Sequence, residues 1–310
     1  MSKSIKVFAP ASVSNVGPGF DLMGFALESP GDEIIVRRKN RSGLFINKIS
    51  GDGYVLPTDP KRNTTTVAIQ SLLDKYDISD GLDVEIRKKM GIGSGLGSSA
   101  ASSVGGVYAV NKLLGLKLSK DELLEHALAG EIIASGSLHA DNIAPALYGG
   151  FILVRSYDPI EILKIQFPRK LFVSIVYPDI VIKTCEARKM LPLTVPVRTA
   201  VSQAGNAAGL INGLLTSNYE LIGKSIIDSI AEPLRSKLIP CYKEIRDAAL
   251  SAGALNCNIT GSGPSMFSFS RSLSEAEKIN KVMKDAVRRS GYKSKSYLSG
   301  INRVGPKVIG

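Results

Sequence analysis

Residues 90–102 read MGIGSGLGSSAAS, between a strand-like segment at 82–87 and a run of small residues that ends near Gly115. Glycines at alternate positions let a backbone turn sharply and approach a ligand closely. The helix expected after them would present unpaired N–H groups and the positive end of its dipole. The segment therefore predicts a phosphate-binding loop, with contacts from Gly91, Gly93, Ser94, Gly95, Leu96, Gly97, Ser98, Ser99, Ala100 and Ala101.

Two common nucleotide-binding motifs do not fit this loop. A Walker A loop would need Gly-Lys-Ser/Thr, and the dinucleotide fingerprint would need a glycine where Leu96 or Ser98 stands. A glycine loop with only a packing role is the alternative interpretation. If the loop binds phosphate, valine at Gly95 should abolish nucleotide binding and leave the fold largely intact, because its branched side chain would crowd the phosphates.

The apolar periodicity along the chain indicates an α+β fold, with strands before helices in the first half. Ser119 with Glu122, and Ser274 with Glu277, have the spacing of capping boxes that begin two of the helices. Strands are predicted at 5–9, 33–38, 44–49, 82–87, 171–177, 254–260 and 265–270, and helices at 63–76, at the small-residue run, and at 121–135, 199–216, 219–230, 241–252 and 274–290.

The pattern of elements resets near Asp158-Pro159, which predicts two domains, 1–160 and 161–310. No low-complexity linker or internal repeat marks this boundary. The two halves are therefore expected to share an interface and not to move on a tether.

Composition excludes several classes of protein. The chain has 310 residues, of which 44% are hydrophobic and 22% charged, values ordinary for a soluble globular protein. It has no apolar run long enough to span a membrane and no signal-peptide pattern, so we expect a cytoplasmic protein without a membrane partner. Cys185, Cys241 and Cys257 lack CxxC spacing, which argues against a disulfide framework and a zinc site.

The net charge of +11 favours anionic partners. The basic residues are scattered in short groups such as 37–39 and 87–89, and tryptophan is absent. Because stacking platforms for single-stranded nucleic acid are poor, we expect no nucleic-acid partner.

Three separated segments resemble the three motifs of the GHMP small-molecule kinases, the superfamily of galactokinase, homoserine kinase and mevalonate kinase. These are 9–27 (APASVSNVGPGFDLMGFAL), 93–102 (GSGLGSSAAS) and 258–269 (NITGSGPSMFSF), in the family's order. The resemblance implies ATP and Mg²⁺ as cofactors and a two-lobed fold. Its N-terminal half would be like ribosomal protein S5 domain 2 and its C-terminal half ferredoxin-like, with the active site in the cleft between them. One departure is Gly91, where the family loop usually begins with proline.

Within the superfamily the details are most similar to the homoserine kinases, which phosphorylate the side-chain hydroxyl of L-homoserine on the way to threonine. The resemblance therefore makes L-homoserine the expected small-molecule substrate. The matching positions are Asn15, Asp21, His139, Asn142, Arg188 and Arg235, and the third-motif turn adds Thr260, Gly261 and Ser262 as substrate contacts.

The chemistry of these residue types suits an amino acid. Asp21 can accept from an ammonium group, and the guanidinium groups of Arg188 and Arg235 can hold a carboxylate bidentately. The alternatives are that Asp21 only caps a helix and that both arginines are surface residues. The turn at 260–262 is either an anion-binding turn or a simple hairpin.

The resemblance also assigns catalytic and cofactor roles. It makes Glu131 and Ser98 the Mg²⁺ ligands, consistent with the preference of Mg²⁺ for few protein oxygens plus phosphates, and Asn63 a contact to adenine. Glu131, Ser98 and Asn142 are the expected catalytic residues. The alternatives are a solvated Glu131 and an Asn63 that only caps its helix. Asp141, one residue before Asn142, is the rival candidate for a general base.

Two other functions remain open from the sequence. The chain could be another GHMP kinase of the mevalonate or shikimate type, or a non-catalytic nucleotide-binding relative. A homodimer is compatible with the sequence.

Overall fold

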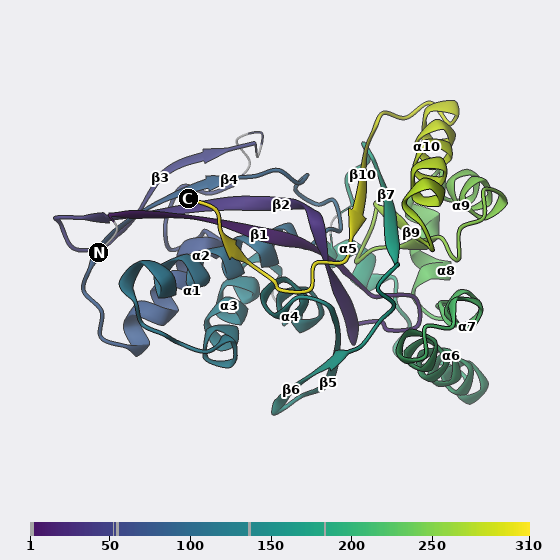
Figure 1. Cartoon of the computed structure of the whole chain (residues 1–310), viewed down its shortest axis with the longest axis horizontal. Helices are drawn as coiled ribbons and strands as arrows, with labels where there is room; N and C mark the ends of the chain where they lie inside the picture. The colour runs from purple at the N-terminus through teal and green to yellow at the C-terminus, as the bar shows by residue number, and fades with distance from the viewer. Residues whose placement is uncertain (1–2, 52, 54–55, 136–137, 183) are drawn as a thin grey trace.

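A computed structural model describes residues 3–51, 53, 56–135, 138–182 and 184–310, with the backbone alone at 134–135 and 184–185. The chain forms two sheets with helices packed against them, and both labelled ends lie beside the larger sheet (Figure 1). No helix in the described part of the chain is long and apolar enough to cross a membrane.

Within the described residues the larger sheet has seven strands, in the order β11-β1-β2-β4-β3, with β5 added to β2 and β6 to β5. Only β3 and β4 pair in parallel among them. The long strand β2 changes partner along its length, from β5 at its start to β4 at its end. The bounds are β1 Ser4–Ser14, β2 Met23–Lys39, β3 Leu44–Ser50, β4 Gly81–Arg87, β5 Phe151–Tyr157, β6 Ile160–Ile165 and β11 Lys307–Val308.

Helices cover one face of this sheet (Figure 1). Helices α2 (Ser98–Leu114) and α4 (Ala140–Tyr148) lie against β1 and β2, and α1 (Thr64–Lys75) and α3 (Lys120–Ser135) pack against α2. Small residues in α2 allow this layering. A Cβ atom on Gly105 would lie 2.6 Å from Cγ1 of Ile34, and one on Gly106 would lie 2.8 Å from Cγ2 of Thr65.

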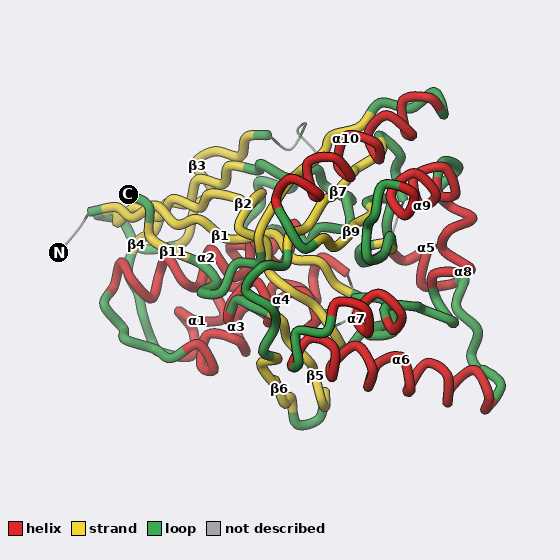
Figure 2. The backbone as a smooth tube through the Cα atoms, turned by 45° about the vertical axis from the view of Figure 1, so that its right-hand side comes forward, coloured by secondary structure: helices red, strands yellow, loops and turns green. Residues whose placement is uncertain are grey.

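The smaller sheet has four described strands in the order β10-β7-β9-β8, all antiparallel. The chain order of these strands and their main helices is βαββαβ, so the expected ferredoxin-like half is confirmed. Helices α9 and α10 lie together beside this sheet (Figure 2). The bounds are β7 Phe172–Pro178, α5 Thr184–Lys189, α6 Val197–Leu215, α7 Tyr219–Ser225, α8 Glu232–Arg235, a 3₁₀ turn Ser236–Leu238, α9 Tyr242–Ser251, β8 Asn258–Ile259, β9 Met266–Ser270, α10 Leu273–Arg289 and β10 Ser294–Gly300.

The two sheets share one hydrophobic cluster. Phe25 of β2 packs against Phe151 of β5, with ring centroids 4.8 Å apart, and against Phe267 and Phe269 of β9, at 5.7 and 5.3 Å. All four rings are fully buried. This continuous core fits the expectation that the halves share an interface.

The division of the chain into two domains at residue 160 stays a prediction, and the strand pairing shows which segments each side contributes to the larger sheet. Strand β6, residues 160–165, continues the larger sheet through β5, and β11 returns to pair with β1. Each half of the chain therefore contributes strands to the larger sheet.

Most predicted elements are present with shifted bounds. The capping box of Ser119 and Glu122 is confirmed, since each residue's backbone N–H bonds to the other's side chain. The capping box predicted at Ser274 and Glu277 is wrong by two residues. Ser272 is the N-cap of α10, and it accepts from the backbone N–H of Glu275. Cys241 and Cys257 are buried free thiols, whereas the side chain of Cys185 lies outside the described atoms.

Candidate active site

The glycine loop leads directly into the N-terminus of α2. Gly93, Gly95 and Gly97 have φ angles of +69°, +75° and +62°, a left-handed conformation that other residues rarely adopt. Gly97 is the N-cap of α2 and provides no side-chain cap. The first N–H groups of a helix have no partner inside it, so those of α2 can bind an anion.

The residues after the loop differ in what they can offer a ligand. Ser98 and Ser99 are half-buried in the first turn of α2, with hydroxyl groups as well as backbone groups. Ala100 and Ala101 are fully buried, so only their backbone could take part. Leu96 is also fully buried, and its side chain anchors the loop in the core shared by the two sheets.

The other two motifs hold this loop. The hydroxyl of Thr260 donates to the carbonyl oxygen of Gly95 at 2.7 Å, and the backbone N–H of Ser12 donates to that of Leu96 at 3.1 Å. The first and third motifs are therefore bonded to the second, although they lie far apart in sequence.

The departure at Gly91 has a steric explanation. A Cβ atom on this residue would lie 2.4 Å from Cε1 of Tyr177, on β7. Because that distance is far inside van der Waals contact, a larger residue at the loop entry would require the tyrosine ring to move.

A buried ion pair supports the loop. Lys88 Nζ pairs with the carboxylate of Asp32 and donates to the carbonyl of Ser98 and the hydroxyl of Ser102, both at 2.8 Å. Asp32 is fully buried and Lys88 nearly so. Removing one member of a buried pair typically costs about 3–5 kcal/mol, so this pair fixes the first turn of α2 against β2 and the end of β4.

The first motif places Asn15 and Asp21 in strained backbone conformations, with φ of 56° and 54°. Asn15 accepts from the backbone N–H of Asp21 at 2.8 Å and donates to the carbonyl of Gly261 at 3.0 Å. Arg188 donates both terminal nitrogens to one oxygen of Asp21, at 3.2 and 2.5 Å. Two residues predicted to bind opposite ends of a substrate are thus paired with each other.

Arg235 is a buried cation in this cluster. Only 5% of the residue is exposed, and burial lowers the pKa of its guanidinium. Its Nη1 donates to the carbonyl of Gly261 at 2.9 Å, while within the described chain its buried Nε has no hydrogen-bond partner. A buried guanidinium in this state favours an anionic ligand. The neighbouring Ser262 is half-buried in the same turn.

Asp141 and Asn142, at the start of α4, differ in their surroundings. Asn142 accepts from the hydroxyl of Ser12 and donates to that of Ser14, each at 2.9 Å. Asp141 is fully buried, and desolvation together with the charge of Asp21 raises the pKa of its carboxyl group to about 7.

Glu131 lies on α3 and is buried, with its carboxylate 3.6 Å from Nδ1 of His139. The nearby carboxylate of Glu131 raises the pKa of His139. The preceding Gly130 lets α3 approach α2, because a Cβ atom there would lie 2.5 Å from Oγ of Ser103.

The donor set suits Mg²⁺ bound largely by phosphates. No cluster of three or more acidic, histidine or cysteine side chains able to hold a metal occurs in the described part of the chain. Mg²⁺ commonly takes one or two protein oxygens plus substrate phosphates. One buried carboxylate and one hydroxyl at the helix start, from Glu131 and Ser98, fit that pattern.

Two further polar residues have structural roles. Asn63 is the N-cap of α1, accepting from the backbone N–H of Thr65 and donating to the carbonyl of Pro57, both at 3.0 Å. The alternative role as a helix cap is therefore confirmed, and the contact to adenine stays a prediction. His126 is buried and bonded to Ser71 at 2.9 Å, away from these motifs.

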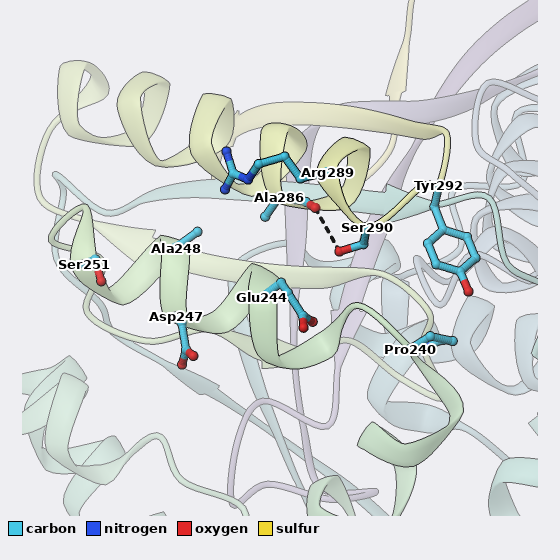
Figure 3. A pocket seen from close by; sticks show the side chains of 9 residues that line it. All are labelled: Pro240, Glu244, Asp247, Ala248, Ser251, Ala286, Arg289, Ser290 and Tyr292. Atoms are coloured by element: carbon cyan, nitrogen blue, oxygen red, sulfur yellow. Dashed lines mark hydrogen bonds between the residues drawn. The ribbon is translucent and has the colours of Figure 1, made fainter.

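Two cavities lie outside this cluster of motifs. Figure 3 shows one of about 650 Å³ between α9 and α10, lined by side chains that include Glu244, Arg289 and Tyr292. The other, of about 640 Å³, is lined mainly by apolar residues of α3 and β6 such as Leu128 and Ile162. Neither is lined by a residue predicted here to bind substrate or nucleotide.

The motifs do not indicate the Lys88–Asp32 pair, because Lys88 lies outside them in a short basic group. The alternation of side-chain directions along the strands does indicate that both side chains point inward. Val84 and Ile86 are buried, and Lys88 continues their period of two, as Asp32 does with Ile34. Sequence reasoning also missed Tyr157 of β5, whose hydroxyl donates to the carbonyl of Asp21 at 2.7 Å.

Comparison with known proteins gives consistent matches. Residues 63–150 match the family model "GHMP kinases N terminal domain", and residues 208–289 match "GHMP kinases C terminal". A homoserine kinase of Chlorobium phaeobacteroides is 44% identical over 99% of this chain and 100% of its own length. One of Pyrococcus abyssi is 36% identical over 96% and 97%.

Solved structures agree. A homoserine kinase from Cytophaga hutchinsonii is 49% identical, with a TM-score of 0.98 over 100% of this chain and 98% of that one. A mevalonate kinase of L. major in complex with R-mevalonate has a TM-score of 0.75 over 96% of both chains at 19% identity, and therefore shows a common fold only.

Proposed function

The chain belongs to the GHMP kinase family, and we propose that it transfers the γ-phosphoryl group of ATP to the side-chain hydroxyl of L-homoserine. It is an ATP-dependent small-molecule kinase, and its relatives of matching length are homoserine kinases. The product would be O-phospho-L-homoserine, on the way to threonine.

The grouping of Asp21, Arg188 and Arg235 around the third-motif turn is the observation that supports this substrate. An amino acid carries an ammonium and a carboxylate on one carbon. We infer that the substrate's ammonium forms an ion pair with Asp21 and that its carboxylate forms ion pairs with the guanidinium groups. The Asp21–Arg188 pair would thereby be exchanged for two new pairs, so the charges stay neutralised before and after binding.

Around this exchange the remaining contacts would orient the substrate. Asn15 and the turn at 260–262 are joined to Arg235 through the carbonyl of Gly261. His139 lies beside the buried Glu131 and two residues before Asp141 in sequence. Holding the hydroxyl in line with the γ-phosphate is a main source of rate in phosphoryl transfer.

The nucleotide would bind with its phosphates at the glycine loop and the N-terminus of α2, where backbone N–H groups face an anion. Mg²⁺, held by Glu131 and Ser98, would neutralise charge on the phosphate oxygens. Asn63 is the proposed neighbour of the adenine.

We propose that no side chain acts as an early general base. The Asn142 amide cannot accept a proton at neutral pH, and its two hydrogen bonds to β1 suit it for aligning the hydroxyl. A loose transition state requires little early deprotonation of the attacking oxygen. Loop amides would stabilise the charge on the transferring group.

A substrate panel tests the proposal. With ATP and Mg²⁺, the enzyme should convert L-homoserine to O-phospho-L-homoserine and leave mevalonate, galactose and shikimate nearly untouched, as followed by ADP release and phosphorus NMR. Two analogues extend the panel: 3-aminopropan-1-ol lacks the carboxylate and 4-hydroxybutyrate lacks the amine. Turnover of mevalonate at a rate comparable to that of homoserine would contradict the assignment.

A further inference from the structure

Phe20, between Gly19 and Asp21 in the first motif, has an unusual environment for an aromatic residue. Its side chain is half-buried, and within the described chain it belongs to none of the three hydrophobic clusters of the core. Its ring centroid instead lies 5.0 Å from Cζ of Arg235 and 6.0 Å from Cζ of Arg188. The ring therefore contacts two cations at once.

This arrangement counters a problem that the two arginines create. Their like charges repel, and the charge of Arg188 contributes to the lowered pKa of Arg235. The faces of an aromatic ring are electron-rich and attract a guanidinium within about 6 Å of the centroid. A single ring in contact with both groups offsets part of their repulsion and restricts where each can lie.

The need for such a restraint is greatest when substrate binds. Arg188 has 37% of its side chain exposed and forms an ion pair with Asp21. If the substrate's ammonium takes Asp21, as in the proposed function on which this inference rests, Arg188 loses that partner. A long exposed side chain released in this way must be ordered again to hold the carboxylate, and that ordering costs affinity.

We propose that Phe20 is a positioning residue for the substrate's carboxylate. Its ring holds the guanidinium groups of Arg188 and Arg235 in place while Asp21 changes its ion-pair partner from Arg188 to the substrate's ammonium. The effect should appear in the binding of homoserine and not in the chemical step or in nucleotide binding.

Three variants of the full-length enzyme test this role. Phe20→Leu keeps an apolar side chain and removes the ring, and Phe20→Tyr keeps the ring. Phe45→Leu is the matched control, because Phe45 on β3 also carries an arginine, with Arg41 Cζ 3.8 Å from its centroid, but contacts none of the motifs. Steady-state KM and kcat for both substrates, with the thermal midpoint of unfolding, are the measurements.

We expect Phe20→Leu to raise KM for homoserine by about five- to thirty-fold, the loss of two cation–π contacts. Its KM for ATP and its kcat should stay near those of the wild type. Phe20→Tyr should restore most of the KM, and Phe45→Leu should leave all constants unchanged. The inhibition constant of 3-aminopropan-1-ol, which has no carboxylate, should be the same in Phe20→Leu and wild type.

Other outcomes overturn the inference. An unchanged KM for homoserine in Phe20→Leu, or equal rises in both KM values, would mean that the ring has no positioning role. If Phe20→Leu does not fold, Phe20→Met takes its place, and failure of both to fold would make Phe20 a packing residue. Failure of the proposed function would be seen separately, as absent turnover of homoserine by the wild-type enzyme.

Discussion

Asp141 and Asn142 are adjacent residues with different proton chemistry, and they decide between two mechanisms. A general base works best when its pKa lies near the working pH, and the pKa of Asp141 is raised to about 7. Asn142 cannot accept a proton at neutral pH, but it is held by two serines of β1. The base-free mechanism assigns the rate to alignment and electrostatics, whereas the alternative assigns it to Asp141.

Single-turnover rates at saturating ATP and homoserine distinguish the two. We expect Glu131→Gln to reduce the rate by about 10²–10³, the size of one lost electrostatic contact at the transferring group. Asn142→Ala should cost less, and Asp141→Asn less still. A loss of about 10²–10⁴ in Asp141→Asn, with little effect at Glu131, would instead identify Asp141 as the base.

The pH dependence of stability gives a prediction at Asp141 that does not involve catalysis. Its pKa rises from an ordinary 3.8 to about 7 on folding, so the folded state holds this proton more tightly than the unfolded state. The stability contributed by this group is therefore fully present below about pH 3.8 and is lost as pH rises toward 7.

Replacement by asparagine removes this loss. We expect Asp141→Asn to raise the thermal midpoint, relative to the wild type, more at pH 8 than at pH 5, as measured by calorimetry. If the difference in thermal midpoint between Asp141→Asn and the wild type is the same at both pH values, Asp141 is ionised in the folded protein.

At the scale of elements, the glycine loop and the third-motif turn are built as one unit. A Cβ atom on Gly95 would lie 2.5 Å from the carbonyl oxygen of Thr260 and 2.9 Å from that of Gly263. The expectation that valine at Gly95 would spare the fold is therefore wrong, because the side chain would meet protein backbone before it met phosphate.

Three alanine variants separate backbone strain from loss of the ligand site. Gly93→Ala and Gly115→Ala both place alanine at a positive φ, +69° and +70°, but a Cβ atom meets little at Gly93 and nothing at Gly115, the C-cap of α2. Each should lose about 1–2 kcal/mol of stability. Of these two variants, only Gly93→Ala should also weaken binding of a nonhydrolysable ATP analogue in calorimetric titration. Gly95→Ala should lose the most stability of the three.

Equal affinity for the analogue in Gly93→Ala and Gly115→Ala would move the phosphate site away from the loop. Gly115→Ala is the control for strain, since it lies at the opposite end of the same helix.

The elements show how far the sequence could be interpreted. The strand at 82–87 and the helix of residues 98–114 were predicted within a few residues, because apolar and charged residues alternate along the first and glycines bound the second. Short elements such as α5 and α8, which carry Arg188 and Arg235, have too few turns for a period. Their residues were found through motif resemblance, and Phe20 and Lys88 were missed because contact across the chain defines their roles.

On the scale of the whole molecule, the aromatic core of Phe25, Phe151, Phe267 and Phe269 makes the two sheets depend on each other. The lack of a low-complexity linker or internal repeat near residue 160 predicted that the halves share an interface. It could not predict which rings meet, since these come from segments more than a hundred residues apart.

Phe25→Ala tests this dependence. Truncating a buried phenylalanine typically costs about 3–5 kcal/mol, and we expect one cooperative transition at a lower temperature, with loss of hydrogen-exchange protection in both β4 and β10. Met283→Ala, on the buried face of α10, should likewise lower protection in both sheets. Two separate calorimetric transitions would mean that the halves unfold independently.

The return of β11 to the larger sheet has a consequence for how the protein is made. Ile309 donates its backbone N–H to the carbonyl of Lys6 at 2.8 Å, and β11 pairs with β1 on the side away from β2. A ribosome produces β1 long before β11. One edge of β1 therefore stays unpaired until β11 has been made, and an unpaired strand edge can pair with another chain. The enzyme should be most prone to aggregation as a nascent chain, before residues 307–310 leave the exit tunnel.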